Sequence, residues 1–369
     1  MVRSQAFGPW FGLLVVQKVP RKFGSLDCLD YGQHTIQYCT STAASYSVRS
    51  LLCTMRRFLP LVIDQIAKSA PSSAAIISPN QQRFQLLTYQ QLSARTINIA
   101  RSLQELGYQR HDVLVSDLPN VAENLLLQVA CSRIGVVYAT AKDADALTEL
   151  TAVAPQGVRG AVTTNLESFL GKASLAHAAI AVGESELSSA SRSQISFDAD
   201  ATPSPSTLAG QAIGDAPSLS TPFAYYNSLK PTTMEEVVGL GEQAARHLSL
   251  TAADRVCVSI TLCHTFGIGS ACSSALLNGA AIVLPAVGGI RGCGNPAQRA
   301  EATLSVLSGA KCSLLFADTH TLGALEACQP SSAALSHLRG GVVKVGSGSD
   351  ILDGTVRLAN VSLATLGKK

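Results

Sequence analysis

The chain has 369 residues, of which 47% are hydrophobic and 14% are charged, and its formal net charge is +3. This composition excludes a disordered chain and is sufficient for a sizeable core in two or three domains. The sequence contains no long run of Lys and Arg, so nucleic acid is not an expected partner. It also lacks a stretch of about 20 apolar residues, so no membrane span is expected.

Residues 1–57 differ in charge from the rest of the chain. They contain seven Lys or Arg, two Asp and no Glu. A basic segment rich in Ser and apolar residues is typical of a mitochondrial transit peptide. We therefore predict a mitochondrial protein whose translation starts at Met1 or, with a shorter leader, at Met55. The alternative is an N-terminal extension without a targeting signal, in a cytoplasmic protein.

From residue 58 the hydrophobic periodicity alternates between helix and strand. Thr88 is expected to cap a helix, with Gln91 completing a capping box and Gly107 ending the helix. The elements predicted in this part are helices at 58–70, 88–107 and 121–135 and strands at 73–78, 112–118 and 136–140. Strands that alternate with helices of this length form parallel sheets covered on both faces.

Residues 183–221 are rich in Ser, Ala, Pro and Gly, and this segment is predicted to be a linker or long surface loop. The alternation of helix and strand then resumes. The elements predicted there are helices at 234–248, 269–279, 295–310 and 320–328, strands at 254–261, 280–285 and 311–317, and a final strand and turn at 338–348.

Ten cysteines are scattered along the chain without a Cys-x-x-Cys pair. The densest group, Cys257, Cys263 and Cys272 with His264, does not have the spacing of a zinc site. We therefore expect no metal centre. The cysteines are expected to be small buried hydrophobic residues in a reducing compartment.

Several segments, taken in serial order, resemble the adenylate-forming (AMP-binding) superfamily, which includes acyl-CoA synthetases, firefly luciferase and peptide-synthetase adenylation domains. Residues 87–140 resemble its early signature, with a Thr-Tyr helix start, a Leu-Gly ending and a Pro-Asn turn. "LCHTFGIG" at 262–269 is similar to its Pro-x-x-His-x-x-Gly block, and "GGVVKVGSGSD" at 340–350 is similar to the strand and glycine turn that follow. The likeness covers about residues 58–350 and looks closest to medium-chain acyl-CoA synthetases.

This resemblance implies an α/β fold like the N-terminal part of acyl-CoA synthetases, with two stacked αβα subdomains and largely parallel sheets, at 58–182 and 222–369. It implies a reaction in which a carboxylate attacks the α-phosphate of ATP and a thiol, usually coenzyme A, then takes the acyl group. A Tyr-Gly-x-Thr-Glu motif of the family binds Mg²⁺ through its carboxylate. The chain stops at Lys369 without this motif. We therefore expect the C-terminal domain to be absent and the second subdomain to have an exposed sheet edge.

The phosphate loop of the family falls on a segment that has no glycine between Pro222 and Val238. The three glycine positions of the loop fall on Ser228, Pro231 and Glu235. The backbone cannot close around phosphates without glycine, proline lacks an N–H, and a glutamate brings negative charge to a polyanion. We therefore predict that ATP binding in the manner of the family is lost.

Two groups of residues still match the functional motifs of the family. Lys230, Thr232 and Thr233, together with the turn Gly346-Ser347-Gly348, are assigned to a remnant nucleotide site. His264, Phe266 and Gly267 are assigned to the acyl substrate pocket. The alternative for the turn is a strand end that needs glycine, and the alternative for the histidine is packing at a strand end. No catalytic residue and no metal ligand are assigned.

A formal G-x-G-x-x-A pattern occurs at Gly239, Gly241 and Ala244. It lies inside a helical pattern and no convincing strand precedes it, so it does not predict a dinucleotide site.

The leading hypothesis is a degenerate, catalytically inactive member of the superfamily, located in mitochondria, that binds no cofactor. Its role is structural, or it binds protein partners such as a mitochondrial assembly. One alternative is an active medium-chain acyl-CoA synthetase, an acid–thiol ligase that uses ATP, Mg²⁺ and coenzyme A, represented by an incomplete chain. The other is an acyl- or lipid-binding protein that keeps the pocket around His264 without chemistry.

Overall fold

The computed structural model describes residues 16–17, 35–36, 58–81, 84–140, 144–154, 157–163, 180–181, 197, 218–226, 229–285 and 294–368. The chain forms two compact units, Met1–Arg56 and Arg57–Lys369. In the first unit, β1 (Val16–Gln17) pairs antiparallel with β2 (Thr35–Ile36). Most of the predicted leader at 1–57 and of the predicted linker at 183–221 lies outside the described residues.

The second unit contains a six-stranded sheet with the order β10-β9-β6-β5-β7-β8. Its strands are β5 (Val113–Ser116), β6 (Val137–Thr140), β7 (Val158–Thr163), β8 (Ile180–Ala181), β9 (Pro222–Tyr225) and β10 (Thr232–Thr233). All neighbouring strands are parallel except β9 and β10. The sequence predicts β5 and β6 but not β7, because an arginine and a glycine interrupt the apolar pattern of that strand.

The second unit also contains an eight-stranded sheet with the order β15-β16-β14-β13-β11-β12-β3-β4. Its strands are β3 (Ala74–Ile77), β4 (Leu86–Thr88), β11 (Arg255–Ser259), β12 (Ala281–Val283), β13 (Leu314–Asp318), β14 (Gly340–Lys344), β15 (Ser347–Leu358) and β16 (Val361–Lys368). The inner strands are parallel, and only the two edge strands β4 and β15 are antiparallel to their neighbours.

Local sequence signals explain where several helices of the second unit begin or end. They are α2 (Leu59–Ser69), α3 (Tyr89–Glu105), α4 (Ala122–Ile134), α5 (Ala144–Val153), α8 (Met234–His247), the π-helix η1 (Phe266–Ser273), α9 (Ser274–Leu277), α10 (Pro296–Gly309) and α11 (Thr319–Ala327). The capping box predicted for α3 is confirmed, since Thr88 Oγ1 accepts from the Gln91 amide at 3.2 Å and Gln91 Oε1 from the Thr88 amide at 3.0 Å. Gly135 ends α4 with a left-handed φ of 72°.

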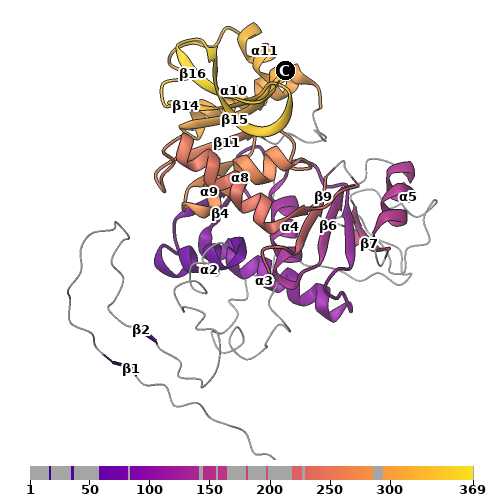
Figure 1. Cartoon of the computed structure of the whole chain (residues 1–369). Helices are drawn as coiled ribbons and strands as arrows, with labels where there is room; N and C mark the ends of the chain where they lie inside the picture. Colours follow the sequence, from indigo (N-terminus) through magenta and orange to yellow (C-terminus); the bar gives the residue numbers. More distant parts are fainter. Residues whose placement is uncertain are drawn as a thin grey trace, which may run out of the picture. The chain divides into compact units, whose positions relative to one another are not determined.

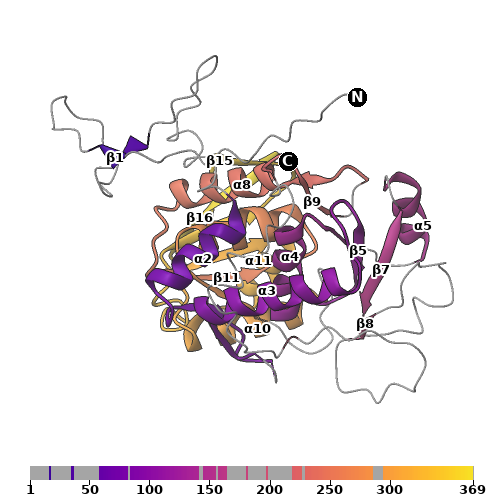
Figure 2. The ribbon, with the colours of Figure 1, turned by 90° about the horizontal axis from the view of Figure 1, so that it is seen from below.

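The elements of the second unit form two stacked αβα arrangements that share their middle helices (Figures 1 and 2). One face of the eight-stranded sheet packs against α10 and α11. Its other face and one face of the six-stranded sheet enclose α2, α3, α4, α8, η1 and α9 in a common core. The remaining face of the six-stranded sheet packs against α5. The predicted fold class is therefore confirmed.

The two sheets do not follow the predicted division into 58–182 and 222–369. β3 and β4 come from the first of these segments but join the eight-stranded sheet, where β3 pairs with β12. β9 and β10 come from the second segment but join the six-stranded sheet, where β9 pairs with β6. Helical and strand periodicity is a local property, whereas strand pairing depends on contacts that are distant in sequence. The described part of residues 57–369 is thus one interleaved unit.

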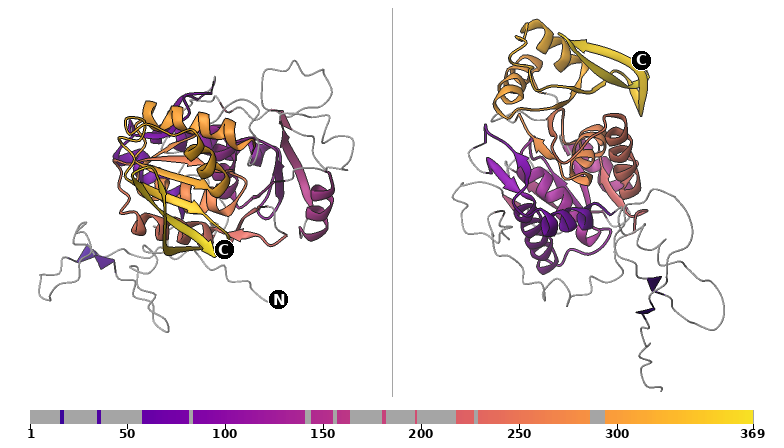
Figure 3. Two further views of the ribbon diagram at one scale, coloured as in Figure 1. Left: turned by 90° about the horizontal axis from the view of Figure 1, so that it is seen from above. Right: turned by 90° about the vertical axis from the view of Figure 1, so that its left-hand side faces the viewer.

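The strand predicted at 338–348 is not the final one. β14 is followed by the hairpin of β15 and β16, which Figure 3 shows in yellow at the edge of the sheet. β16 pairs parallel with β14, and β15 pairs only with β16 among the described strands. Among the described strands, the 12-residue β15 is therefore at the edge of this sheet.

Candidate functional site

Members of both groups of predicted site residues lie near the carboxyl ends of β11 and β14. Thr232 Oγ1 lies 3.5 Å from Thr265 Oγ1, beside His264. Lys344, at the end of β14, donates to the Gly348 carbonyl at 2.9 Å, and its charge acts on His264. In open α/β sheets, ligands bind beyond the carboxyl ends of parallel strands. We therefore take these strand ends as the candidate site.

The loop between β11 and η1, which carries His264, is held in place by the side chain of Asn120. Asn120 Nδ2 donates to the Ile260 carbonyl at 3.0 Å, and Asn120 Oδ1 accepts from the Leu262 amide at 2.9 Å. Gln128 Nε2 donates to the Leu262 carbonyl at 3.2 Å. Two side chains from the six-stranded half of the core, Asn120 and Gln128, therefore hold a loop of the eight-stranded half. Sequence analysis used the Pro-Asn turn only as part of a resemblance and missed this role.

A buried hydrogen-bond network extends from Gln128 between the two sheets. Gln128 Nε2 donates to Asn124 Oδ1 at 2.8 Å, Tyr138 donates to the same oxygen at 3.0 Å, and Tyr226 donates to Gln128 Oε1. Burial raises the pKa of both tyrosines well above the usual value, so each hydroxyl remains a donor. Asn124 also donates to Cys263 Sγ at 4.0 Å. The network thus connects α4, β6 and β9 to the residue that precedes His264.

His264 is half-buried, and one of its ring nitrogens is already engaged. His264 Nδ1 accepts from the Phe266 amide at 3.1 Å. Burial, and secondly the charge of Lys344, lower the pKa of the imidazole below its usual value. The ring is therefore neutral near pH 7, and its proton lies on Nε2, because Nδ1 is an acceptor.

The other two residues predicted to line the acyl pocket have packing roles. Phe266 is fully buried, and its ring centroid lies 5.8 Å from that of Phe316. A Cβ at Gly267 would lie 2.1 Å from the Thr261 carbonyl oxygen, so only glycine fits at this position, where the loop continues into η1. Of the three residues predicted at this position, His264 alone presents a polar group.

The predicted remnant of the phosphate loop forms a strand turn and a helix cap. Thr232 and Thr233 form β10, and Thr233 is the N-cap of α8, with Glu236 completing a capping box. The sequence contains this Thr-x-x-Glu signal, which sequence analysis did not use. Lys230 is 84% exposed, and its Nζ lies 4.0 Å from a carboxylate oxygen of Glu236.

Each of the first four amides at the N-terminus of α8 has an acceptor within the chain. The Thr233 amide donates to Glu236 Oε2 at 2.7 Å, and the Glu236 amide donates to Thr233 Oγ1 at 3.2 Å. The Met234 amide donates to the Thr221 carbonyl at 3.1 Å, and the Glu235 amide donates to the Leu219 carbonyl at 2.8 Å. Phosphates bind helix N-termini through such amides when they are free.

The predicted glycine turn connects β14 to β15. Gly348 has a left-handed φ of 94°, which favours glycine, and Ser347 is the first residue of β15. A Cβ at the opposing Gly367 would lie 2.7 Å from the carbonyl oxygens of Gly346 and Ser347. Glycine is therefore required here by turn geometry and by the close approach of β16.

The G-x-G-x-x-A pattern lies within α8, as the sequence predicts. A Cβ at Gly241 would lie 2.5 Å from Ser273 Oγ and 2.9 Å from the backbone carbon of the same residue, whereas a Cβ at Gly239 would have no neighbour within 4 Å. Gly241 thus permits close packing of α8 on η1.

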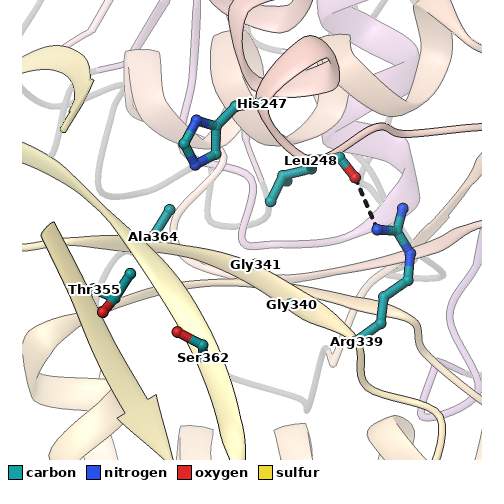
Figure 4. A pocket seen from close by; sticks show the side chains of 8 residues that line it. All are labelled: His247, Leu248, Arg339, Gly340, Gly341, Thr355, Ser362 and Ala364. Atoms are coloured by element: carbon teal, nitrogen blue, oxygen red, sulfur yellow. Dashed lines mark hydrogen bonds between the residues drawn. The ribbon is translucent and has the colours of Figure 1, made fainter. Parts of the chain in front are cut away.

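A cavity of about 260 Å³ lies away from the candidate site, at the amino end of β14 (Figure 4). Its lining includes His247, Arg339, Thr355 and Ser362. Arg339 is engaged by the Asp254 carboxylate at 2.9 Å and by the Leu248 carbonyl at 2.8 Å. The cavity therefore offers no free guanidinium, and none of the predicted site residues lines it.

Within the described ranges, no three His, Cys, Asp or Glu residues are grouped so as to hold a metal ion. The thiols of the predicted cluster are free, with Cys257 and Cys272 fully buried and Cys263 partly buried. Burial raises the pKa of all three thiols. None of the helices described in the structure is long and apolar enough to cross a bilayer.

Comparison with known proteins gives one family. The profile of the AMP-binding enzyme family matches residues 63–218. Acetyl-coenzyme A synthetase of Pasteurella multocida (strain Pm70) is 35% identical over 69 residues, which are 19% of this chain and 11% of that protein.

Solved structures extend the likeness to most of the chain. The anthranilate CoA ligase AuaEII, in complex with anthranoyl-AMP, matches with a TM-score of 0.60 and 17% identity, over 80% of this chain and 54% of that one. The N-terminal subdomain of NpsA from Klebsiella oxytoca matches with a TM-score of 0.56 and 15% identity, over 82% of this chain and 68% of that one. VinN matches with a TM-score of 0.58 and 15% identity, over 79% and 68% of the two chains. The chain thus spans about half the length of the ligase and has the fold of its N-terminal portion.

Proposed function

We propose a non-catalytic role for this chain, which belongs to the AMP-binding superfamily and corresponds to its N-terminal portion. In this proposal the protein does not form acyl-adenylates. It acts as a structural or interaction subunit that keeps the core of an acyl-CoA synthetase-like enzyme.

The observation that carries the proposal is that the amides of residues 233–236 are all hydrogen-bonded within the chain. To bind a phosphate, α8 would have to break the capping box and the two bonds to the carbonyls of Leu219 and Thr221. Loss of a cap alone destabilises a helix by roughly 0.5–2 kcal/mol. A phosphate would therefore compete with intramolecular acceptors for every one of these donors.

The charge at the same helix end also opposes nucleotide binding. Glu235 and Glu236 are exposed in the first turn of α8. The helix dipole favours negative charge at this end, and these two carboxylates already supply it. They would repel the triphosphate, and the exposed Lys230 offsets only part of their charge. The local chemistry thus stabilises the helix and disfavours a polyanion.

The proposal is tested by calorimetry with ATP and Mg²⁺ and by pyrophosphate release with a panel of fatty and aryl acids. We expect neither saturable heat nor pyrophosphate. A ligand at about 100 times its dissociation constant stabilises a fold by roughly 2.7 kcal/mol, so an unchanged melting temperature with ATP is an independent readout.

Two alternatives predict different outcomes in these assays. Saturable ATP binding that is lost in Lys230→Ala, but kept in the exposed control Lys68→Ala, would support an active synthetase that uses ATP, Mg²⁺ and coenzyme A. A melting shift with an acyl ligand, and none with ATP, would support an acyl-binding protein with a pocket at His264.

We further propose that the protein works in mitochondria with a protein partner. Support for the compartment comes from the seven basic and two acidic residues of segment 1–57. A fluorescent fusion of residues 1–60 is expected to enter mitochondria, and cytosolic fluorescence would contradict this. Affinity purification of the full chain from mitochondria, with identification of the co-purifying proteins, tests the partner. Recovery of the chain alone would argue against an interaction role.

A further inference from the structure

The cavity at the amino end of β14 is lined by polar side chains from three elements (Figure 4). They are His247 at the end of α8, Thr355 on β15 and Ser362 on β16. All three residues are exposed, so a dissolved molecule can reach them. None of their side chains forms a hydrogen bond with another described residue of the chain. Their donors and acceptors are therefore available to a molecule in the cavity.

The space between these side chains suits a small ligand. The cavity has a volume of about 260 Å³, slightly below the range of about 300–1,000 Å³ that is typical for drug-sized ligands. Its lining includes Gly340, which has no side chain, and a Cβ there would have the Ser362 carbonyl oxygen at 3.8 Å as its nearest neighbour. Leu248 and Ala364 add apolar surface beside the polar groups. The cavity can thus hold a molecule of about the size of a monosaccharide.

The charges around the cavity favour an uncharged ligand. Among its lining residues, Arg339 is the one Arg, Lys, Asp or Glu. Both oxygens of the Asp254 carboxylate accept from this guanidinium, at 3.0 Å from Nε and at 2.9 Å from Nη2, so its charge is compensated. The carboxyl end of α8, which carries the negative end of the helix dipole, also borders the cavity at His247 and Leu248. An anion would therefore find no uncompensated positive charge there.

We propose that this cavity binds a neutral polyhydroxy compound of monosaccharide size through His247, Thr355 and Ser362. A hydroxyl can donate and accept, and a neutral imidazole has one donor and one acceptor. A polyol matches such a lining because each of its hydroxyls can take either role. The cavity lies at the amino end of β14, whereas the candidate site lies at the carboxyl ends of β11 and β14. Binding of a polyol is therefore independent of the proposed non-catalytic role.

The test follows the imidazole signal of His247 by NMR in the full chain at constant pH. D-ribose, D-glucose and myo-inositol are the neutral probes, and acetate and inorganic phosphate are the anionic ones. The signal is assigned with His247→Gln, and the signal of His337, an exposed histidine outside the lining, is the internal reference. We expect a saturable shift of the His247 signal, and no shift of the His337 signal, with at least one neutral probe.

Variants of the two hydroxyl residues test the contacts. In Ser362→Ala and in Thr355→Val the dissociation constant should rise about two- to tenfold, the size expected for one neutral hydrogen bond. Ser362→Thr keeps a hydroxyl and should retain most of the affinity. Ser336→Ala removes an exposed hydroxyl outside the lining, shortly before β14, and should leave binding unchanged.

Three results would overturn the proposal. They are no saturable shift with any neutral probe, unchanged affinity in both Ser362→Ala and Thr355→Val, and tighter binding of acetate or phosphate than of every neutral probe. The two hydroxyls have no partner among the described residues, so the variants are expected to fold like the wild type. Matching thermal unfolding of wild type and variants checks this. Because no arm contains ATP, failure of this proposal is distinguishable from failure of the proposed non-catalytic role.

Discussion

Substituting each of two glycines of α8 by alanine provides a direct test of how α8 packs on η1. At Gly241, a Cβ would lie 2.5 Å from Ser273 Oγ and 2.9 Å from the Ser273 backbone carbon. A side-chain hydroxyl can rotate, but the backbone of a buried helix cannot move cheaply. Forcing a methyl group into a packed interior costs about 1–3 kcal/mol.

Gly239 is the matched control because it lies two residues away in the same helix. It is exposed, and a Cβ there would meet nothing within 4 Å. Replacing glycine by alanine in a helix interior stabilises by roughly 0.5–1 kcal/mol. Both substitutions gain this stabilisation of the helix. The difference between their free energies of unfolding therefore reports only the packing cost at Gly241. We expect Gly239→Ala to stabilise the fold and Gly241→Ala to destabilise it, with a difference of about 1–3 kcal/mol.

The assay is equilibrium urea unfolding followed by far-UV circular dichroism. The single tryptophan, Trp10, lies outside the described residues. A change in midpoint without a change in slope reports stability alone. If both alanine variants are equally stable, α8 does not approach η1 as closely as described. The packing explanation of the Gly-x-Gly pattern would then be wrong.

Two further substitutions test the polar interior. Asn120→Ala leaves a buried carbonyl and a buried N–H without partners. We therefore expect its free energy of unfolding in urea to fall by about 2–4 kcal/mol. The exposed control Asn80→Ala should lose less than about 0.5 kcal/mol. Burial raises the pKa of Asp254, but hydrogen bonds lower it to about 2, and those from Arg339 have the largest effect among them. Asp254 therefore stabilises the fold above pH 3.8, and this contribution is lost as the pH falls toward 2. The stability gap between wild type and Asp254→Asn should close over that range, and a constant gap would contradict this reasoning.

Local sequence signals were sufficient to predict where most helices begin and end. Thr88 with Gln91 and Gly135 are caps whose chemistry acts within one helical turn, so they can be recognised without the fold. The same rule applied to Thr233 and Glu236 would have identified a second capping box. The resemblance of this segment to a phosphate loop did not indicate its structural role.

Long-range contacts could not be predicted in this way. The pairing of β3 with β12 joins segments about 200 residues apart, and no periodicity within either strand indicates its partner. Asn120 and Gln128 show the same limit at the candidate site, because in the sequence they are isolated polar residues among apolar ones. Their function as donors to the loop of His264 exists only once the two sheets are in place.

The N-terminus of α8 and the loop of His264 are held by different contacts. Phosphate binding would need the amides of α8, which the capping box and the carbonyls of Leu219 and Thr221 already occupy. The loop of His264 depends on Asn120 and on the fold of both halves, and neither involves α8 amides. Occupied amides at α8 are therefore compatible with an ordered loop after β11.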